Sequence, residues 1–314
     1  MAVDLSTVSG FPNGWFVAAF SDELAPGGVQ PIRYFATDMV LFRTEAGDAV
    51  ILDAHCPHMG AHLGYDGVVK DGCIECPFHA WVFGTDGVCT HIPYQQEIPR
   101  KARLRAWHVA ERNGMIFVWH HREGAAPSWQ IPELVEHGAQ GWTTWGHSRM
   151  DIKTHPKEII ENVADKQHFP RVHRTHLTRF DNVFEGHVAT QITEGVAYPR
   201  PGQKDTFKLD ATYYGPAYQI TKMDGVLSSV LVNAHTPIED KLLHLRFGVM
   251  IRDTGDRARN EKFKAGYVDN LTKGFLEDVA IWEHKVYRKS PLLLKNDGPI
   301  GKVRRWYGQF YEGG

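Results

Sequence analysis

Two short peptides, each joining a cysteine to a histidine, constrain this chain more than any other feature of its sequence. The first is Cys56-Pro-His58 and the second, after a spacer of seventeen residues, is Cys76-Pro-Phe-His79. Each peptide offers one thiolate and one imidazole from a tight, proline-containing loop. Two cysteines and two histidines suit a [2Fe–2S] cluster in which the cysteines hold one iron and the histidines hold the other. The sequence therefore predicts such a cluster, bound by Cys56, His58, Cys76 and His79.

Other uses of these four residues fit the pattern less well. A zinc finger pairs its cysteines in one half and its histidines in the other, whereas here each half carries one of each. The chain has 4 cysteines in a composition that suits a reducing compartment, which disfavours a disulfide. Cys73 forms an accidental C-x-x-C with Cys76 and, like Cys89, is expected to be an ordinary thiol. His55 and His62 are less favoured as ligands, because neither lies at the spacing from a cysteine that the two loops share.

A second group of metal-binding residue types lies further along the chain. It reads Asp165-Lys-Gln-His168-Phe-Pro170-Arg-Val-His173, with Asn162 three residues before Asp165. Because Asn162, Asp165 and His168 are three residues apart, a helix would place them on one face. Pro170 is expected to end or distort this helix, so that His173 can return toward the same metal. Two imidazoles and one carboxylate, with open positions left, suit a non-haem Fe(II) that activates O2.

The carboxylate for this iron must come from elsewhere, because Asp165 is better used otherwise. The best candidates are Asp278 and Glu277, in a segment with a long helical pattern from about residue 260 to residue 285. Spacing within the chain does not choose between these two residues. His176 remains an alternative to His173 as the second histidine ligand.

With these motifs in this order, the chain resembles the Rieske non-haem iron oxygenases. Within them it is most similar to the branch of 3-ketosteroid 9α-hydroxylases and cholesterol 7-desaturases. The match to the family's pattern implies Asp278 as the third iron ligand. Further shared segments are Glu161-Asn162-Val163, Asp278 to Lys285, Asp297-Gly298-Pro299 and Arg304 to Tyr311.

The resemblance also implies how the two metal sites work together. In the family, a ferredoxin or an NAD(P)H-dependent reductase delivers electrons to the cluster, which passes them to the iron of a neighbouring subunit in a trimer. Asp165 would then bridge His58 or His79 of one subunit to His168 of the next, since a carboxylate accepts hydrogen bonds from two imidazoles at once. Asn162 would help to order the site.

The implied activity is hydroxylation of a steroid or a similar apolar ring with O2. Desaturation or oxidative removal of a methyl group uses the same chemistry, because the outcome depends on which C–H bond faces the oxidant. Two other classes remain as alternatives. One is a Rieske electron-transfer protein without oxygenase activity, and the other is a colourless, zinc-stapled binding protein.

The expected fold is α+β with two domains. Residues 1–125 are predicted to form an all-β Rieske [2Fe–2S] domain, with paired strands at residues 34–42 and 48–52 and a last strand at residues 114–119. Residues 126–314 are predicted to form a helix-grip-like catalytic domain, in which long helices cover an antiparallel sheet. Its strands are expected between residues 183 and 251, with a turn at residues 223–225.

The net charge and the hydropathy of the chain exclude some classes of binding partner. A net charge of −2 implies no nucleic-acid partner. No apolar run approaches about eighteen residues, so no membrane segment is expected. The chain has no G-x-G-x-x-G that opens a helix after a strand, so its electrons are expected from a separate protein. Without a visible export signal at its N-terminus, the chain is expected in the cytoplasm.

Overall fold

The computed structural model describes residues 4–5, 8–197, 204–224 and 228–312. They form two compact units. The smaller unit contains residues 16–120 and 124–130, and the larger unit contains the rest of the described chain. Antiparallel strands dominate both units and the helices gather in the larger one, so the predicted α+β class is confirmed.

The smaller unit consists of three small antiparallel sheets and one short 3-10 helix, η1 (Ser21–Glu23), in agreement with an all-β domain. The first sheet has the order β1 (Gly14–Phe20), β10 (Met115–His120), β9 (Val109–Arg112). The second has the order β2 (Val29–Tyr34), β3 (Thr37–Arg43), β4 (Ala49–Asp53). The third has the order β5 (Val68–Lys70), β6 (Cys73–Glu75), β7 (Val82–Phe83), β8 (Cys89–His91).

The pairing of β3 with β4 confirms the hairpin that the sequence predicts, but β3 begins later than expected. Tyr34 is the last residue of β2 and lies opposite Thr37, the first residue of β3. Between them, Phe35 and Ala36 turn the chain with φ angles of 54° and 55°. Such turns usually carry Gly, Asn or Asp, so this one left no signal in the sequence.

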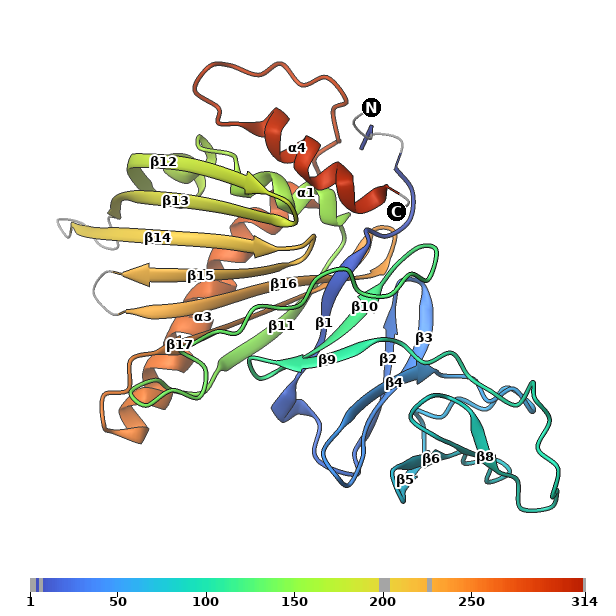
Figure 1. The fold of residues 1–314 in the computed structure, drawn as a ribbon. Coiled ribbons are helices and arrows are strands. Elements are labelled where there is room, and N and C mark those ends of the chain that lie inside the picture. Colours follow the sequence, from blue (N-terminus) through green and yellow to red (C-terminus); the bar gives the residue numbers. More distant parts are fainter. Residues whose placement is uncertain (1–3, 6–7, 198–203, 225–227, 313–314) are drawn as a thin grey trace. The chain divides into compact units, whose positions relative to one another are not determined.

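The larger unit is built on a seven-stranded antiparallel sheet with the order β11-β17-β16-β15-β14-β13-β12 (Figure 1). The strands of this sheet begin before the expected residue 183, with one strand from Gly146 and the next from Thr175. β15 ends at Asp224 in the predicted turn, whose Gly225 lies outside the described residues. The bounds are β11 (Gly146–Ile152), β12 (Thr175–Glu185), β13 (Val188–Ala197), β14 (Asp205–Tyr214), β15 (Tyr218–Asp224), β16 (Ser229–Glu239) and β17 (Leu242–Ile251).

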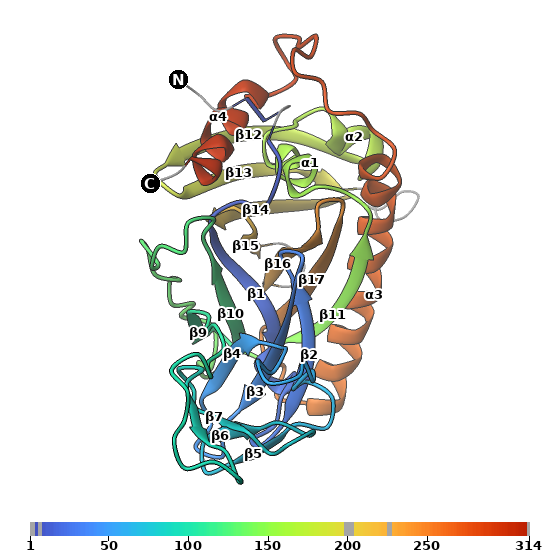
Figure 2. The same ribbon diagram turned by 90° about the vertical axis from the view of Figure 1, so that its right-hand side faces the viewer.

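One long helix, α3 (Arg257–Trp282), runs across a face of this sheet (Figure 2), as the helical pattern from residue 260 predicted. Asp256 caps its start, since Oδ1 accepts a hydrogen bond from the Arg259 amide at 3.1 Å. Phe275 and Leu271 then pack against Phe247 and its neighbours. The shorter helices are α1 (Pro156–Ile160), η2 (Glu161–Val163), α2 (His168–Val172), α4 (Ile300–Gly308) and η3 (Gln309–Tyr311).

The segment before β1 belongs to the larger unit by its contacts. The Asn13 amide donates to the Phe310 carbonyl at 2.6 Å, and Asn13 Nδ2 donates to the Glu312 carbonyl at 3.1 Å. These bonds hold the start of the chain against its C-terminal helix. Among the described residues, none of the helices has the length and apolar character needed to cross a membrane.

Candidate metal centres and substrate cavity

Two loops in the smaller unit present their cysteines in the same way. The amide four residues after each cysteine donates to the cysteine carbonyl, from Gly60 to Cys56 at 2.9 Å and from Ala80 to Cys76 at 3.1 Å. Gly60 and Ala80 both have positive φ, of 78° and 54°. The cysteine amides also find equivalent acceptors, the carbonyls of Ala61 and Trp81, at 2.9 and 2.8 Å. The two loops are therefore near copies of one another.

The four predicted cluster ligands come together between these loops. Cys56 and Cys76 are buried free thiols within hydrogen-bond reach of each other, and the rings of His58 and His79 lie with their centroids 4.6 Å apart. Burial raises the pKa of the Cys56 thiol to about 11, with the neighbouring Cys76 as a further cause. A bound metal cluster would stabilise these sulfurs as thiolates. Two buried thiols beside two imidazoles fit a [2Fe–2S] cluster.

Two aromatic residues that the sequence did not mark as site residues support this centre. The Trp81 ring stacks on His58, with centroids 4.8 Å apart and planes 7° from parallel. Trp81 Nε1 in turn donates to the Tyr94 hydroxyl at 2.8 Å. Trp81 directly follows the second loop and Tyr94 comes later in the chain, and the folded structure brings both side chains to His58.

The competing histidines near the cluster are engaged elsewhere. His55 Nδ1 lies 3.1 Å from the Gly60 carbonyl, and His62 Nδ1 accepts from the Gly64 amide at 3.0 Å. The two rings also contact each other, with centroids 5.1 Å apart. Cys89 is buried, and its Sγ lies 3.5 Å from the His91 carbonyl.

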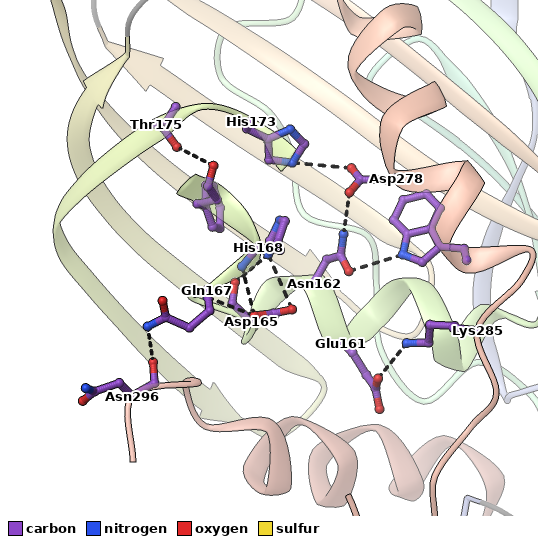
Figure 3. Close-up of polar contacts among 12 residues, drawn as sticks. Glu161, Asn162, Asp165, Gln167, His168, His173, Thr175, Asp278, Lys285 and Asn296 are labelled. Atoms are coloured by element: carbon purple, nitrogen blue, oxygen red, sulfur yellow. Dashed lines mark hydrogen bonds and ion pairs between the residues drawn. The ribbon is translucent and has the colours of Figure 1, made fainter. Parts of the chain in front are cut away.

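The second centre lies in the larger unit and combines two helices (Figure 3). His168 begins α2, His173 follows its last residue, and Asp278 lies on α3. One candidate ligand atom from each residue lies within 4.8 Å of the others, and His173 Nε2 is 3.5 Å from Asp278 Oδ2. Glu277 and His176 are exposed and outside this group. The three residues chosen from the sequence are thus brought together.

The path of the chain through this centre differs from the sequence-based expectation. Asn162, Asp165 and His168 do not share one helix, because η2 ends at Val163 and α2 begins at His168. Pro170 does not end α2 either. It is the third residue of the helix, where an amide has no partner within the helix, so its missing N–H costs little. The chain turns instead at Arg174, whose φ is 52°.

The backbone carbonyl of Asp165 orients the ring of His168, and the carboxylate of Asp165 lies close to the same ring. His168 Nδ1 is 2.7 Å from the Asp165 carbonyl and 3.8 Å from its carboxylate Oδ2. Asp165 Oδ1 accepts from the amides of Gln167 and His168 at 3.0 and 3.3 Å. Because the carbonyl fixes Nδ1 as the protonated nitrogen, Nε2 of His168 is left with a lone pair for a metal. The Asp165 side chain is 38% exposed.

Asn162 connects the carboxylate ligand to a tryptophan. Its Nδ2 donates to Asp278 Oδ1 at 3.4 Å, and its Oδ1 accepts from Trp282 Nε1 at 3.3 Å (Figure 3). The indole N–H can only donate, so it fixes the orientation of the amide. The amide of Asn162 is thus placed to hold the Asp278 carboxylate in position. Trp282 is a site residue that the sequence analysis missed.

Burial sets the charge state of the ligands. It raises the pKa of Asp278 to about 7 and lowers the pKa of His173 to about 4, with His168 as a second cause for His173. Burial likewise lowers the pKa of His168. At neutral pH the site thus offers two neutral imidazoles and a carboxylate that is costly to ionise without a cation. This donor set fits a divalent metal.

Ion pairs hold the elements around this centre. Glu161 Oε1 accepts from Arg304 of α4 at 2.7 Å, and Glu161 Oε2 lies 2.9 Å from Lys285 Nζ. Lys285 also lies 2.9 Å from Glu158 of α1. The network ties the segment after α3 and the middle of α4 to the 3-10 helix η2, which carries Asn162. These contacts give a structural reason for the shared segments around Glu161, Lys285 and Arg304.

The Asp297-Gly298 segment supports the Asp165 turn. The Lys166 amide donates to the Asp297 carbonyl at 2.9 Å, and Gln167 Nε2 donates to the Asn296 carbonyl at 2.7 Å. Gly298 has a φ of 105°, and a Cβ there would collide with the Ala164 carbonyl. Only glycine satisfies both conditions.

A cavity of about 460 Å³ opens beside the second centre. This volume falls in the range of about 300–1,000 Å³ that is usual for small-molecule sites. Its walls come from the inward face of the sheet and from α3. Apolar side chains form most of the lining, and the candidate metal ligands line it too; the apolar residues include Phe207, Leu209, Leu231, Leu245, Leu271 and Phe275.

Two family descriptions match the chain. "Rieske [2Fe-2S] domain" matches residues 14–106, and "3-Ketosteroid 9alpha-hydroxylase C-terminal domain" matches residues 118–311. Together they account for both units. The predicted cluster is confirmed by the first match, and the predicted mononuclear iron agrees with the site of His168, His173 and Asp278.

Curated relatives match nearly the whole chain. The 3-ketosteroid-9-alpha-monooxygenase oxygenase component of Mycolicibacterium smegmatis is 38% identical over 96% of this chain and 82% of its own length. The protein of the same name from Mycobacterium tuberculosis is 35% identical over 96% of this chain and 82% of its own length. Cholesterol 7-desaturase nvd 1 of Ciona intestinalis is 33% identical over 96% of this chain and 69% of its own length.

The fold has solved counterparts. Dicamba monooxygenase bound to dicamba has a TM-score of 0.79 with 20% sequence identity, over 96% of this chain and 98% of that chain. At this identity the likeness concerns the fold alone. The predicted oxidoreductase class is confirmed by the monooxygenase relatives. The chain therefore belongs to the Rieske non-haem iron oxygenases and, within them, to the 3-ketosteroid 9α-hydroxylase family.

Proposed function

We propose that this chain is the oxygenase component of a monooxygenase that hydroxylates a steroid or a similar apolar ring. The observation that carries this proposal is the cavity of about 460 Å³, whose largely apolar walls meet His168, His173 and Asp278. An apolar ring system would bury its surface against those walls and present a C–H bond to the metal. Relatives named 3-ketosteroid-9-alpha-monooxygenase support a steroid as the substrate.

We assign each metal centre to its own residues. Cys56, His58, Cys76 and His79 would hold the [2Fe–2S] cluster, and His168, His173 and Asp278 would hold the mononuclear iron. When bound, the cluster would supply electrons one at a time and the iron would supply the activation of O2. By this proposal residues 1–125 act as the Rieske domain and residues 126–314 as the catalytic domain.

The protein's own residues prepare the site in three ways. The Asp165 carbonyl keeps the proton on His168 Nδ1, so that Nε2 faces the metal. Asn162 holds one carboxylate oxygen of Asp278, and the indole of Trp282 holds Asn162. The apolar cavity excludes water around the substrate, which strengthens every electrostatic interaction inside it.

Asp165 is proposed to link the two centres between subunits of a homotrimer. Its Oδ1 is engaged by two backbone amides, and Oδ2 lies on a side chain that is 38% exposed. His58 is exposed as well, with the apolar Met59 and Phe78 beside the cluster loops 65% and 58% exposed. An exposed imidazole with an apolar rim suits contact with the exposed carboxylate of a second copy.

Electrons would come from a separate ferredoxin or NAD(P)H-dependent reductase. The relatives' description as an oxygenase component supports such a partner. A cytoplasmic location is part of the proposal, because the four cysteines are free thiols.

Desaturation is the second candidate activity. The relative named cholesterol 7-desaturase favours it, since that protein matches 96% of this chain. Oxidative demethylation would use the same iron and the same cavity. A pure electron carrier is disfavoured, because it would have no need for the three converging ligands beside a cavity.

The proposal is tested by O2 uptake with a reductase present, followed by product mass, across steroids, sterols and small aromatic acids. A steroid product heavier by one oxygen atom supports ring hydroxylation. A product lighter by two hydrogen atoms would replace hydroxylation with desaturation. Turnover confined to aromatic acids would overturn the steroid assignment.

A further inference from the structure

One position on α3 leaves space in the cavity that a larger residue would fill. Gly274 lines the cavity together with residues before and after it in the helix. These lining residues recur every three or four positions, as expected for one face of a helix, and they include Tyr267, Leu271, Gly274, Asp278 and Trp282. Gly274 therefore lies on the inward face of α3, one turn before the metal ligand Asp278.

Neither the backbone nor the packing requires glycine at this position. Gly274 lies inside α3 and has no positive φ, so other residues can adopt its conformation. In the described parts of the chain, no atom outside the helix's own backbone lies within 4 Å of a Cβ built on Gly274. Glycine inside a helix is also less stable than alanine, because it loses more conformational freedom on folding. The fold would therefore accept a larger residue, whose side chain would take its volume from the cavity.

A second glycine of the same helix provides a comparison. Gly266 likewise has no described atom within 4 Å of a Cβ built on it. It is exposed, whereas Gly274 is half-buried, and it is not among the residues that line the cavity. The two glycines share a helical backbone and freedom from collisions, and they differ in whether they face the cavity.

The missing side chain matters most for a wide and rigid ligand. A fused ring system cannot bend around a protruding side chain, so it comes close to α3 only where the helix carries none. At Gly274 this approach lies one turn from Asp278, which places the ring beside the proposed iron. Atoms added to a filled site force the surrounding side chains out of their preferred rotamers, so a larger residue here would oppose the ring.

Resting on the proposed function, we propose that Gly274 is a specificity-determining residue that admits fused-ring steroids to the iron site. One face of the ring system lies against the bare backbone of α3 at Gly274, and apolar side chains of the sheet, such as Leu209 and Leu231, cover the other. A side chain at this position would restrict the cavity to smaller rings. Gly274 takes no part in the reaction itself.

The test is equilibrium binding to the holoenzyme, measured by titration calorimetry. Androstenedione is the probe with four fused rings, and 2-decalone is a ketone with two. Gly274→Leu is expected to weaken the binding of androstenedione by about tenfold or more, the usual effect of overpacking. Gly274→Ala should cause a smaller loss, and the affinity for 2-decalone should stay unchanged. Where 2-decalone binds too weakly to measure, the steroid result decides alone.

Gly266→Leu is the matched control, because it adds the same side chain to the same helix outside the cavity lining. It should bind androstenedione as the wild type does. Both leucine variants should melt about 2–4 °C higher than the wild type, since each replaces a glycine inside a helix. Both should also keep the wild-type iron content, because neither removes a ligand or a partner of a ligand.

Wild-type affinity for androstenedione in Gly274→Leu overturns the inference, and so does an equal loss of affinity in Gly266→Leu. Loss of iron from Gly274→Leu would overturn it as well, because the position would then act through Asp278. Failure of the wild-type protein to bind androstenedione would instead overturn the proposed substrate class. The two failures are therefore distinguishable.

Discussion

At the scale of single residues, the metal centre is made of side chains that are costly to bury until a cation arrives. Asp278 shows this most clearly, since burial alone is the largest cause of its pKa of about 7. Its neighbour Glu277 has the same charge but is exposed. Of these two adjacent carboxylates, Asp278 is the one that lines the cavity.

Asp278→Asn is expected to stabilise the metal-free protein at neutral pH while abolishing iron binding. The folded-state pKa is raised, so protonation favours the fold, and stability is lost as the pH rises from about 4 to about 7. The Asp278→Asn variant has no such loss and should be more stable than the wild type by about 4 kcal/mol at pH 8, with a smaller difference at about pH 5. Denaturant unfolding of the metal-free protein measures this. Glu277→Gln is the control, and an equal gain there would refute the argument.

Asn162→Ala is expected to weaken iron binding by about tenfold to a hundredfold, as is usual when a partner of a ligand is lost. The substitution leaves Asp278 Oδ1 without its donor and Trp282 Nε1 without its acceptor. Competition with a chelator measures the affinity. Trp282→Phe should show a smaller loss in the same direction, and full affinity in Asn162→Ala would exclude the positioning role.

Asp165→Ala is expected to keep both metals and lose turnover, because it removes the proposed bridge between the centres. It also removes the acceptor for the Gln167 and His168 amides, so Asp165→Asn is the matched variant that keeps this acceptor. Loss of turnover in both variants, with normal iron content, identifies the charge as the important property. Wild-type turnover in Asp165→Asn would show that no carboxylate is needed there.

At the scale of elements, the two cluster loops repeat one backbone design with different residues. Gly60 and Ala80 occupy equivalent positions with positive φ, which glycine adopts freely and alanine adopts at a cost of about 1 kcal/mol. No atom lies within 4 Å of a Cβ built on Gly60, so the cost at that position is confined to the backbone.

The reciprocal substitutions at these positions should therefore act in opposite directions. Ala80→Gly is expected to raise the temperature at which the cluster loses its visible absorbance, and Gly60→Ala is expected to lower it. Each change should correspond to about 0.5–1 kcal/mol. The same direction of change in both variants would contradict the equivalence of the loops.

The ligands that lie close together in the sequence could be predicted from it. The site residues that depend on contacts between distant parts of the chain could not. Cys56, His58, Cys76 and His79 are paired within a few residues, so their pattern could be read directly. Whether Asp278 or Glu277 faces the cavity depends on how α3 is rotated about its axis, and the spacing in the sequence does not fix this rotation. Only the resemblance to the family favoured Asp278.

Other features depend on contacts that span the chain. Gly298 faces the Ala164 carbonyl, and Trp282 reaches Asn162 across more than a hundred residues. The break between η2 and α2 was missed because the spacing of Asn162, Asp165 and His168 also suits a continuous helix.

At the scale of the whole molecule, each unit is organised around one metal centre. The smaller unit surrounds the cluster loops with short sheets, and the larger unit lays a long helix over a wide sheet that walls the cavity. The sequence analysis expected an all-β part followed by further strands and a long helix, and the order of the elements agrees with it. The N-terminal segment escaped prediction, since its place beside the C-terminal helix rests on the bonds of Asn13.

The most direct test of the account is turnover of a steroid under ¹⁸O2 by the holoenzyme with a reductase. The account predicts that one labelled oxygen atom enters the product. It also predicts that Asp278→Ala, with its cluster absorbance intact, forms no product. A product whose added oxygen comes from water, or full turnover by Asp278→Ala, would contradict oxygenation at this centre.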